Sequence, residues 1–250
     1  MAAPAFVQAG SGLTVTTGTA TASLAGATAG NLIIVQGYAD GTTLDFSVGN
    51  AVNTNTLAGT GPDLSYLANF GTGSTVVGYQ FIELGRVISN GTVSQDFTVG
   101  GSGEDLFGRI YEFSGASTGS TFQTVIESDP DPYAFTKGTS TTVSSQAVVT
   151  TGTDGLGCQF VAINANQATV SFTGETGTDW TETVAEYNGG GSLATLQLQT
   201  GAIATATTAG GGGSMTITSA EWCTIGFRII PAISASGTPT PRTGASSLRW

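Results

Sequence analysis

Short stretches rich in Val, Ile, Thr and aromatic residues recur along the chain, and Gly, Ser, Asn or Asp bound each of them. Such stretches predict β-strands separated by turns. No window shows a 3.6-residue apolar stripe, so no helix is expected. The predicted strands are Leu13–Thr17, Leu32–Tyr38, Leu44–Val48, Thr75–Leu84, Val93–Val99, Phe107–Phe113, Thr121–Ile126, Thr141–Val149, Leu156–Ile163, Thr169–Phe172, Trp180–Tyr187, Leu193–Gln199, Met215–Thr218 and Trp222–Ile230. This pattern predicts an all-β fold, either a two-sheet antiparallel β-sandwich or a barrel.

The clearest local turn signal is Ser89-Asn90-Gly91-Thr92, which lies between two predicted strands. Asn-Gly supplies the positive φ angles of a type I′ turn, so the flanking strands are predicted to form one hairpin. Asn90-Gly91-Thr92 also matches a glycosylation sequon, which the turn chemistry explains without a sugar.

Composition supports a single folded body with an extension. Only 9% of the 250 residues are charged, and the 38 glycines keep no three-residue period, which excludes a disordered polyelectrolyte and collagen. The run Gly210–Gly213 is predicted to be a loop because strands lie on both sides of it. Strand patterning stops at Pro231. We therefore expect an N-terminal arm over residues 1–12, a sandwich domain over 13–231 and an extended tail over 232–250.

Charge is unevenly distributed along the chain, whose formal net charge is −11. Residues 1–230 hold four basic and seventeen acidic residues, a formal charge of −13, whereas the last twenty residues carry +2. An acidic body repels phosphate, so a nucleic-acid partner is not expected. The charge can serve solubility alone. The basic tail also suits an acidic neighbour, such as another copy of the chain.

The absence of histidine removes much catalytic chemistry, including a Ser–His–Asp triad and His-ligated metals. No secretory signal or membrane span is visible, so we expect folding in the cytoplasm. Cys158 and Cys223 are then expected to be buried thiols rather than a disulfide. Each alternates with apolar residues on one face of its strand. No cofactor or metal is expected.

Three motif matches have simpler explanations. Gly115–Gly119 fits a nucleophile elbow, but no histidine can activate its serine. Gly100–Phe107 fits one calcium-binding nonapeptide, which functions only in stacked copies. Glu127–Pro132 contains three carboxylates, as some jelly-roll glycoside hydrolases do, with adjacent pairs about 6.6 Å apart on a strand. Pro130 and Pro132 favour an exposed loop instead. A carboxylate glycosidase therefore remains a minor alternative.

Aromatic residues near loops are candidates for stacking on sugars. The candidates for glycan contact are Tyr133, Phe135 and Trp180, with Tyr66 as a further loop aromatic. In the tail, Trp250 is predicted to fill a pocket on a partner, with Arg242 and Arg249 beside it. These three tail residues form the predicted anchor.

Four segments carry a resemblance to known proteins: Gly30–Val35, Gly108–Gly115, the Thr/Ser/Val run Gly138–Thr151, and Trp222–Arg228. Together they resemble jelly-roll-like β-sandwich proteins of tailed-phage virions, such as head decoration or cement proteins, head fibres and tail proteins. The resemblance implies a jelly-roll-like sandwich. It also implies a virion structural role, with partners among copies of the chain and other virion proteins such as the major capsid protein.

We therefore expect a non-enzymatic capsid decoration or cement subunit on the outer head surface, assembled in the host cytoplasm into the virion. The outside of the head is favoured because packaged DNA would repel the acidic body. The main alternative is a tail or fibre protein that binds host-surface glycan. No membrane contact is expected.

Overall fold

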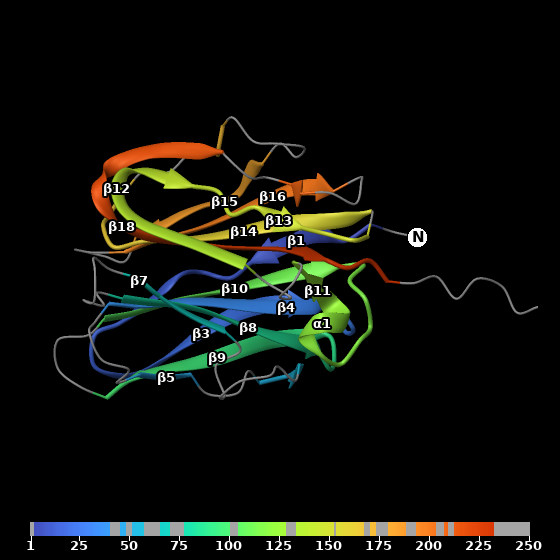
Figure 1. Cartoon of the computed structure of the whole chain (residues 1–250). Helices are drawn as coiled ribbons and strands as arrows, with labels where there is room; N and C mark the ends of the chain where they lie inside the picture. The colour runs from blue at the N-terminus through green and yellow to red at the C-terminus, as the bar shows by residue number, and fades with distance from the viewer. Residues whose placement is uncertain are drawn as a thin grey trace, which may run out of the picture.

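The computed structural model consists almost entirely of antiparallel strands, which confirms the predicted all-β sandwich (Figure 1). It describes residues 3–40, 46–48, 52–57, 66–70, 78–100, 105–128, 134–152, 154–167, 171–173, 180–188, 194–203, 208–209 and 213–232. Two large sheets lie face to face, and smaller sheets cover their outer faces. In Figure 1 the small sheet of β3, β5 and β9 forms the bottom layer, below the two large sheets.

The first large sheet comes from the N-terminal half of the chain, with the strand order β1-β10-β4-β8-β6. β2 also pairs with β10, and β7 also pairs with β8. Its strands are β1 (Ala5–Ala9), β2 (Leu13–Val15), β4 (Leu32–Asp40), β6 (Thr54–Thr56), β7 (Tyr66–Phe70), β8 (Gly78–Val87) and β10 (Asp105–Ser114). The expected N-terminal arm thus contributes β1 to the sandwich.

The second large sheet comes from the C-terminal half, with the strand order β11-β18-β14-β16-β15, and β12 also pairs with β18. Its strands are β11 (Ile126–Glu127), β12 (Ala134–Ser144), β14 (Gly155–Ile163), β15 (Thr181–Asn188), β16 (Thr195–Ile203) and β18 (Ser214–Ile229). The remaining elements are β3 (Gly18–Ala27), β5 (Phe46–Val48), β9 (Gly91–Val99), β13 (Val148–Val149), β17 (Thr208–Ala209) and the helix α1 (Phe122–Val125). β3-β9-β5 and β13-β17 form the small sheets.

The two halves repeat one pairing plan. In the first half β10 pairs with β1, β2 and β4, β4 pairs with β8, and β8 pairs with β7. In the second half β18 pairs with β11, β12 and β14, β14 pairs with β16, and β16 pairs with β15. The small sheets follow the same plan, because β3 pairs with β9 and β13 pairs with β17. β7 lies against β12 and β18, as a two-fold rotation between the halves would place it.

Residue register supports this equivalence. Leu32 pairs with Phe113 near the start of β4, and Leu156 pairs with Ile229 near the start of β14. The outer strands agree, because Phe113 also pairs with Phe6 and Ile229 also pairs with Ile126. The sequence analysis did not detect this repeat, since the two halves share the pattern of burial rather than the residues themselves.

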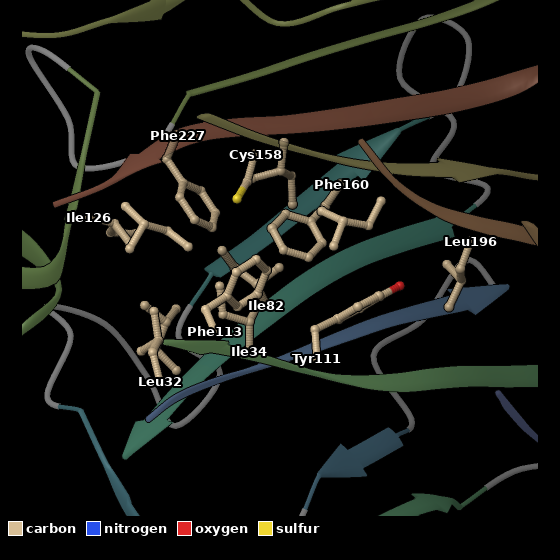
Figure 2. Close-up of a cluster of buried hydrophobic side chains, with 14 of the residues drawn as sticks. Leu32, Ile34, Ile82, Tyr111, Phe113, Ile126, Cys158, Phe160, Leu196 and Phe227 are labelled. Carbon is tan, nitrogen blue, oxygen red and sulfur yellow. The ribbon is translucent and has the colours of Figure 1, made fainter. Parts of the chain in front are cut away.

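The largest hydrophobic core lies between the two large sheets (Figure 2). Its aromatic centre is Phe160, whose ring centroid lies 5.5 Å from Tyr111, edge to face, and 5.5 Å from Phe227, stacked. All three side chains are completely buried. A second core fills the space between the first large sheet and β3-β9, and a third covers the outer face of the second large sheet. The alternation along each strand thus buries both faces of each large sheet.

Buried polar side chains cross the central core. Gln36 on β4 donates from Nε2 to the Val161 carbonyl at 3.0 Å, and Gln80 on β8 donates to the Phe160 carbonyl at 3.0 Å. The Tyr111 hydroxyl donates to Gln36 Oε1 at 2.7 Å. Both glutamine side chains are fully buried. These amides therefore fix how the two large sheets sit on one another.

Two facing glycines fix the second core. Gly37 pairs with Gly108 across β4 and β10. A Cβ on Gly37 would lie 1.9 Å from Phe81 Cζ, and one on Gly108 would lie 2.3 Å from Phe97 Cζ. The two rings thus lie on bare backbone, and Phe97 locks β9 onto the first large sheet.

The equivalent strands β10 and β18 end on the same side of the sandwich. The chain leaves β10 and β18 at neighbouring points, where Ala116 bridges Pro231. β1 begins at this end too, because Ala5 pairs with Ser114. Figure 1 shows the start of β1, α1 and the end of β18 on the right. We call this the termini end; the opposite end, where β4 and β14 finish, is the loop end.

The Asn90-Gly91 turn does not close a hairpin, so that prediction is wrong. β8 belongs to the first large sheet and β9 to the small sheet with β3, so the turn carries the chain from one layer to the next. Asn53 fixes the turn, donating to the Ser89 carbonyl at 2.8 Å and accepting from the Ser89 N–H at 3.1 Å. Asn90 Oδ1 accepts from the Ala29 N–H at 2.8 Å. These long-range bonds, not local turn preference, decide the conformation.

The strand predicted over Thr121–Ile126 is instead largely the four-residue helix α1. Phe122 and Val125, three residues apart, both point into the central core, which a single helical turn allows. The long strand β3 also escaped prediction, because its alternation uses small residues such as Ala22 and Ser23. The predicted strands Met215–Thr218 and Trp222–Ile230 are one strand, β18.

Truncating the aromatic centre of the core should weaken the whole sandwich. We expect Phe160→Ala to lower the free energy of unfolding by about 3–5 kcal/mol, because it removes buried contacts to both large sheets. Urea unfolding followed by intrinsic fluorescence measures this change. The exposed Ser23→Ala should stay within about 0.5 kcal/mol of the parent. Equal effects of the two changes would contradict the proposed central role of Phe160.

Candidate functional site

The two halves bury a charged residue at the same position, and the charges have opposite sign. Glu112 on β10 pairs with Ile33, and Arg228 on β18 pairs with Gly157, the equivalent position. Glu112 is fully buried and Arg228 is 4% exposed. β10 also carries Asp105 and Arg109, and β18 also carries Glu221, so burial distinguishes Glu112 and Arg228 from the other charges of their strands. The sequence shows that both residues alternate with apolar neighbours, but it does not show their burial.

Glu112 is held by three donors. Its carboxylate accepts from Gln8 Nε2 at 2.7 Å, from the Thr28 N–H at 2.8 Å and from Asn31 Nδ2 at 2.7 Å. The donors come from β1 and from the turn between β3 and β4. The carboxylate therefore fastens the first strand and this turn to β10, which is a structural role.

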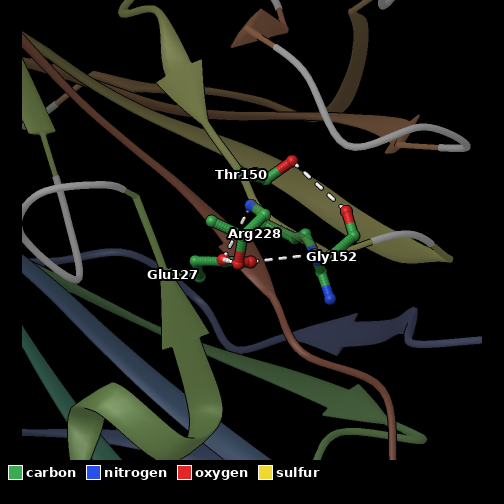
Figure 3. A network of polar contacts seen from close by, with 5 residues as sticks. Glu127, Thr150, Gly152 and Arg228 are labelled. Carbon is green, nitrogen blue, oxygen red and sulfur yellow. Dashed lines mark hydrogen bonds and ion pairs between the residues drawn. The ribbon is translucent and has the colours of Figure 1, made fainter.

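Arg228 forms an ion pair with Glu127 on β11 (Figure 3). Arg228 Nη1 lies 2.8 Å from Glu127 Oε2, while Glu127 Oε1 accepts from the Thr151 N–H at 2.8 Å and from its hydroxyl at 2.5 Å. Burial lowers the pKa of Arg228, and the carboxylates of Glu127 and Asp154 oppose that shift. The ion pair joins β11 to β18, and the hydrogen bonds from Thr151 join β11 to the loop before β14.

Glycines make room for the buried guanidinium. A Cβ on Gly152 would lie 2.2 Å from Arg228 Nη1, and one on Gly155 would lie 2.3 Å from Arg228 Nε. Both oxygens of Glu127 are engaged with Arg228 or Thr151. Glu127 was the first carboxylate of the predicted hydrolase cluster, and the structure gives it a structural use. Asp129 and Asp131 lie outside the described residues.

The two cysteines are free and completely buried, as expected. Cys158 pairs with Phe227 and Cys223 pairs with Ala162, so the thiols lie four residues apart along neighbouring strands. That separation is about 13 Å, too far for a disulfide. Burial raises the pKa of both thiols. At neutral pH they are therefore protonated side chains of the core rather than nucleophiles.

The residues predicted to contact glycan differ in their exposure. Trp180 is only 3% exposed and belongs to the third core, so its prediction as an exposed stacking residue is wrong. Its ring lies over Gly157, which leaves space for it. Phe135 on β12 is 44% exposed and accessible to a partner. Tyr133 lies outside the described residues, and Tyr66 begins the strand β7 rather than lying in a loop.

The start of the tail is tied to the termini end of the sandwich. Ser117 N–H donates to the Ile230 carbonyl at 2.7 Å, and Ala232 N–H donates to the Gly115 carbonyl at 2.8 Å. Arg86 supports this junction by donating to the carbonyls of Gly30 and Ser117. The predicted anchor residues Arg242, Arg249 and Trp250 lie outside the described residues.

Among the described residues, no group of three or more potential ligands could hold a metal ion. In the same part of the chain, no helix is both long and apolar enough to cross a membrane. No family model, curated protein or solved structure matches the chain.

Breaking the buried ion pair should be costly. We expect Arg228→Met to lower the free energy of unfolding by about 3 kcal/mol, because Glu127 loses its charged partner in a half-buried site. The loss should persist at high salt, since a buried pair is poorly screened. Urea titration at low and high salt measures it. The control is Ser23→Ala at an exposed position of β3, expected to change the free energy of unfolding by less than about 0.5 kcal/mol. Equal losses for both variants would contradict the structural role.

The buried thiols should make the protein sensitive to alkali. An unfolded thiol ionises with a pKa of about 8.5, whereas the folded thiols keep their protons to higher pH. The free energy of unfolding should therefore be unaffected by the thiols below pH 8 and fall above that pKa. The slope should be about 1.4 kcal/mol per pH unit for each thiol. Denaturant titrations between pH 8 and 10, with reductant, measure it. Cys223→Ala should remove about half of this slope; an unchanged slope would count against it.

Proposed function

We propose that the protein is a non-enzymatic structural subunit of a tailed-phage virion, most specifically a decoration or cement subunit on the outer surface of the head. Such a subunit stabilises a particle by burying surface between neighbouring copies and the major capsid protein. The proposal extends the resemblance carried by the four strand segments. Its localisation would be the virion, after assembly in the host cytoplasm.

The observation that carries the proposal is the polarity of the sandwich. β1 begins and β18 ends at the termini end, where the Ala116–Pro231 bridge ties the exit of β18 to the body. Extensions from both ends of the chain would therefore leave from one side of a rigid body, as attachment segments should. The basic character of residues 231–250 suits an acidic acceptor.

The chemistry of the described residues supports a role without catalysis. The buried carboxylate Glu112, the Glu127–Arg228 pair and both thiols all serve the fold. A body of formal charge −13 also favours a site away from packaged DNA. No nucleic-acid or membrane partner is proposed.

A tail or fibre protein that binds host-surface glycan is the second candidate. One observation favours it: Phe135 is an exposed aromatic side chain on β12, and Tyr133 precedes this strand directly in the sequence. Aromatic faces of this kind stack on sugar rings. A glycan array with the purified protein separates the candidates, since strong binding to a defined glycan would favour the receptor role.

Removing residues 233–250 tests the decoration role. The truncated protein should keep the parent unfolding midpoint, because it retains β18 and the hydrogen bond from Ala232 N–H to the Gly115 carbonyl. Its incorporation into particles assembled from the structural proteins of the same phage should fall at least ten-fold. The triple variant R242A/R249A/W250A should reproduce the loss if those residues anchor the tail. Normal incorporation of the truncated protein would rule out the tail as the anchor.

A further inference from the structure

The open edge of β12 is the feature with an unassigned use. β12 pairs with β18 on one side, and no other described strand pairs with its second side. Over Ala134–Ser140 it keeps unbroken register with β18. The edge strands β1 and β15 are interrupted by bulges, which discourage further pairing. β3 keeps unbroken register with β9 only over Gly18–Leu24, with a shift between Leu24 and Ala27, and its exposed side chains are small.

Two exposed side chains mark this edge. Phe135 and Lys137 lie two residues apart, so they share one face of β12. That face continues the central core, because their partners on β18 are Ile225 and Cys223. Phe135 is 44% exposed, and Lys137 is exposed as well. When two copies of β12 pair antiparallel, this spacing allows the aromatic ring of each copy to lie opposite the cation of the other.

We propose that β12 pairs antiparallel with β12 of a second copy, about a two-fold axis at Thr136. In this register Phe135 faces Lys137 of the second copy, and Lys137 faces its Phe135. Two cation–π contacts then form across the axis, and the edge hydrogen bonds are satisfied. The interface is self-complementary, as a two-fold dimer requires. It joins the second large sheets of both copies into one continuous sheet.

Neighbouring registers are less favourable. An axis at Lys137 would place the two lysines directly opposite each other, which is repulsive. An axis at Gly138 would place Phe135 and Lys137 opposite threonines, with no complementary contact. Of these three registers, the one at Thr136 gives both exposed side chains a complementary partner.

The acidic bodies oppose this dimer. Each body carries a formal charge of −13, so repulsion between copies weakens association at low salt. The dimer should therefore tighten as salt is added. This inference rests on the proposed function in one respect: strand pairing would supply the contacts between copies on the particle, while the tail supplies attachment.

Cysteine crosslinking of the full-length protein tests the register. Across the axis, Thr136 of one copy lies opposite Thr136 of the second copy. Their Cα atoms are about 4.5–5.5 Å apart, which is within the range of a disulfide. We expect Thr136→Cys to form a disulfide-linked dimer under mild oxidation. Thr139→Cys is the matched control, because its two copies lie about 20 Å apart in this register. The native thiols do not interfere, since both are fully buried.

Sedimentation equilibrium tests the side-chain contacts. Lys137→Gln and Phe135→Ala should each weaken the dimer about ten-fold, whereas Lys137→Arg should preserve it. Ser23→Glu changes the net charge by the same amount as Lys137→Gln at a distant exposed site and should weaken the dimer much less. A monomer at all concentrations and salt levels, or crosslinking of Thr136→Cys no faster than that of Thr139→Cys, would overturn the inference.

The tail-truncated protein separates this inference from the proposed function. It should still dimerise and crosslink through Thr136→Cys, while losing incorporation into particles. If truncation abolishes the dimer and Thr136→Cys does not crosslink, the tail makes the contact between copies and the β12 inference fails, while the decoration role stands. If crosslinking succeeds but truncation leaves incorporation unchanged, the tail-anchored attachment fails instead.

Discussion

The interface between the two large sheets, which we call the seam, fixes the arrangement of the rest of the structure. Phe160 lies between rings from both sheets, and Gln36 and Gln80 donate across the seam to the backbone of β14. Apolar contact alone would allow one sheet to slide over the other. Directional bonds from buried amides remove that freedom, because a shifted sheet would leave them without acceptors in the core. The positions of the outer layers, the turns and the termini end all follow from this fixed stacking.

If the protein is a structural subunit, as proposed above, its outer surface makes the contacts on which its function depends. The ionisable groups that a strand pattern might offer to catalysis are used to tie segments together: Glu112 fastens β1, and Arg228 with Glu127 fastens the approach to β12. Two geometric features of the described surface are available to partners. The termini end brings together the start of β1 and the end of β18, and β12 presents a regular edge over Ala134–Ser140 with Phe135 exposed.

The sequence predicted the fold class and most of the central strands, because alternation of apolar residues in β4, β10, β14 and β18 directly reflects burial. It failed where long-range contacts decide. The Asn90-Gly91 turn joins two layers because Asn53 and Ala29 hold it there, and Trp180 is buried because Gly157 leaves room for its ring. The pairing of Glu127 with Arg228 spans 101 residues, which no local pattern reveals.

The repeated pairing plan does not make the two halves equivalent. The same position holds Glu112 in one half and Arg228 in the other, and each charge has partners only in its own surroundings, Gln8 and Asn31 for Glu112 and Glu127 for Arg228. The halves are therefore not interchangeable, and swapping them would bury two charges beside the wrong partners.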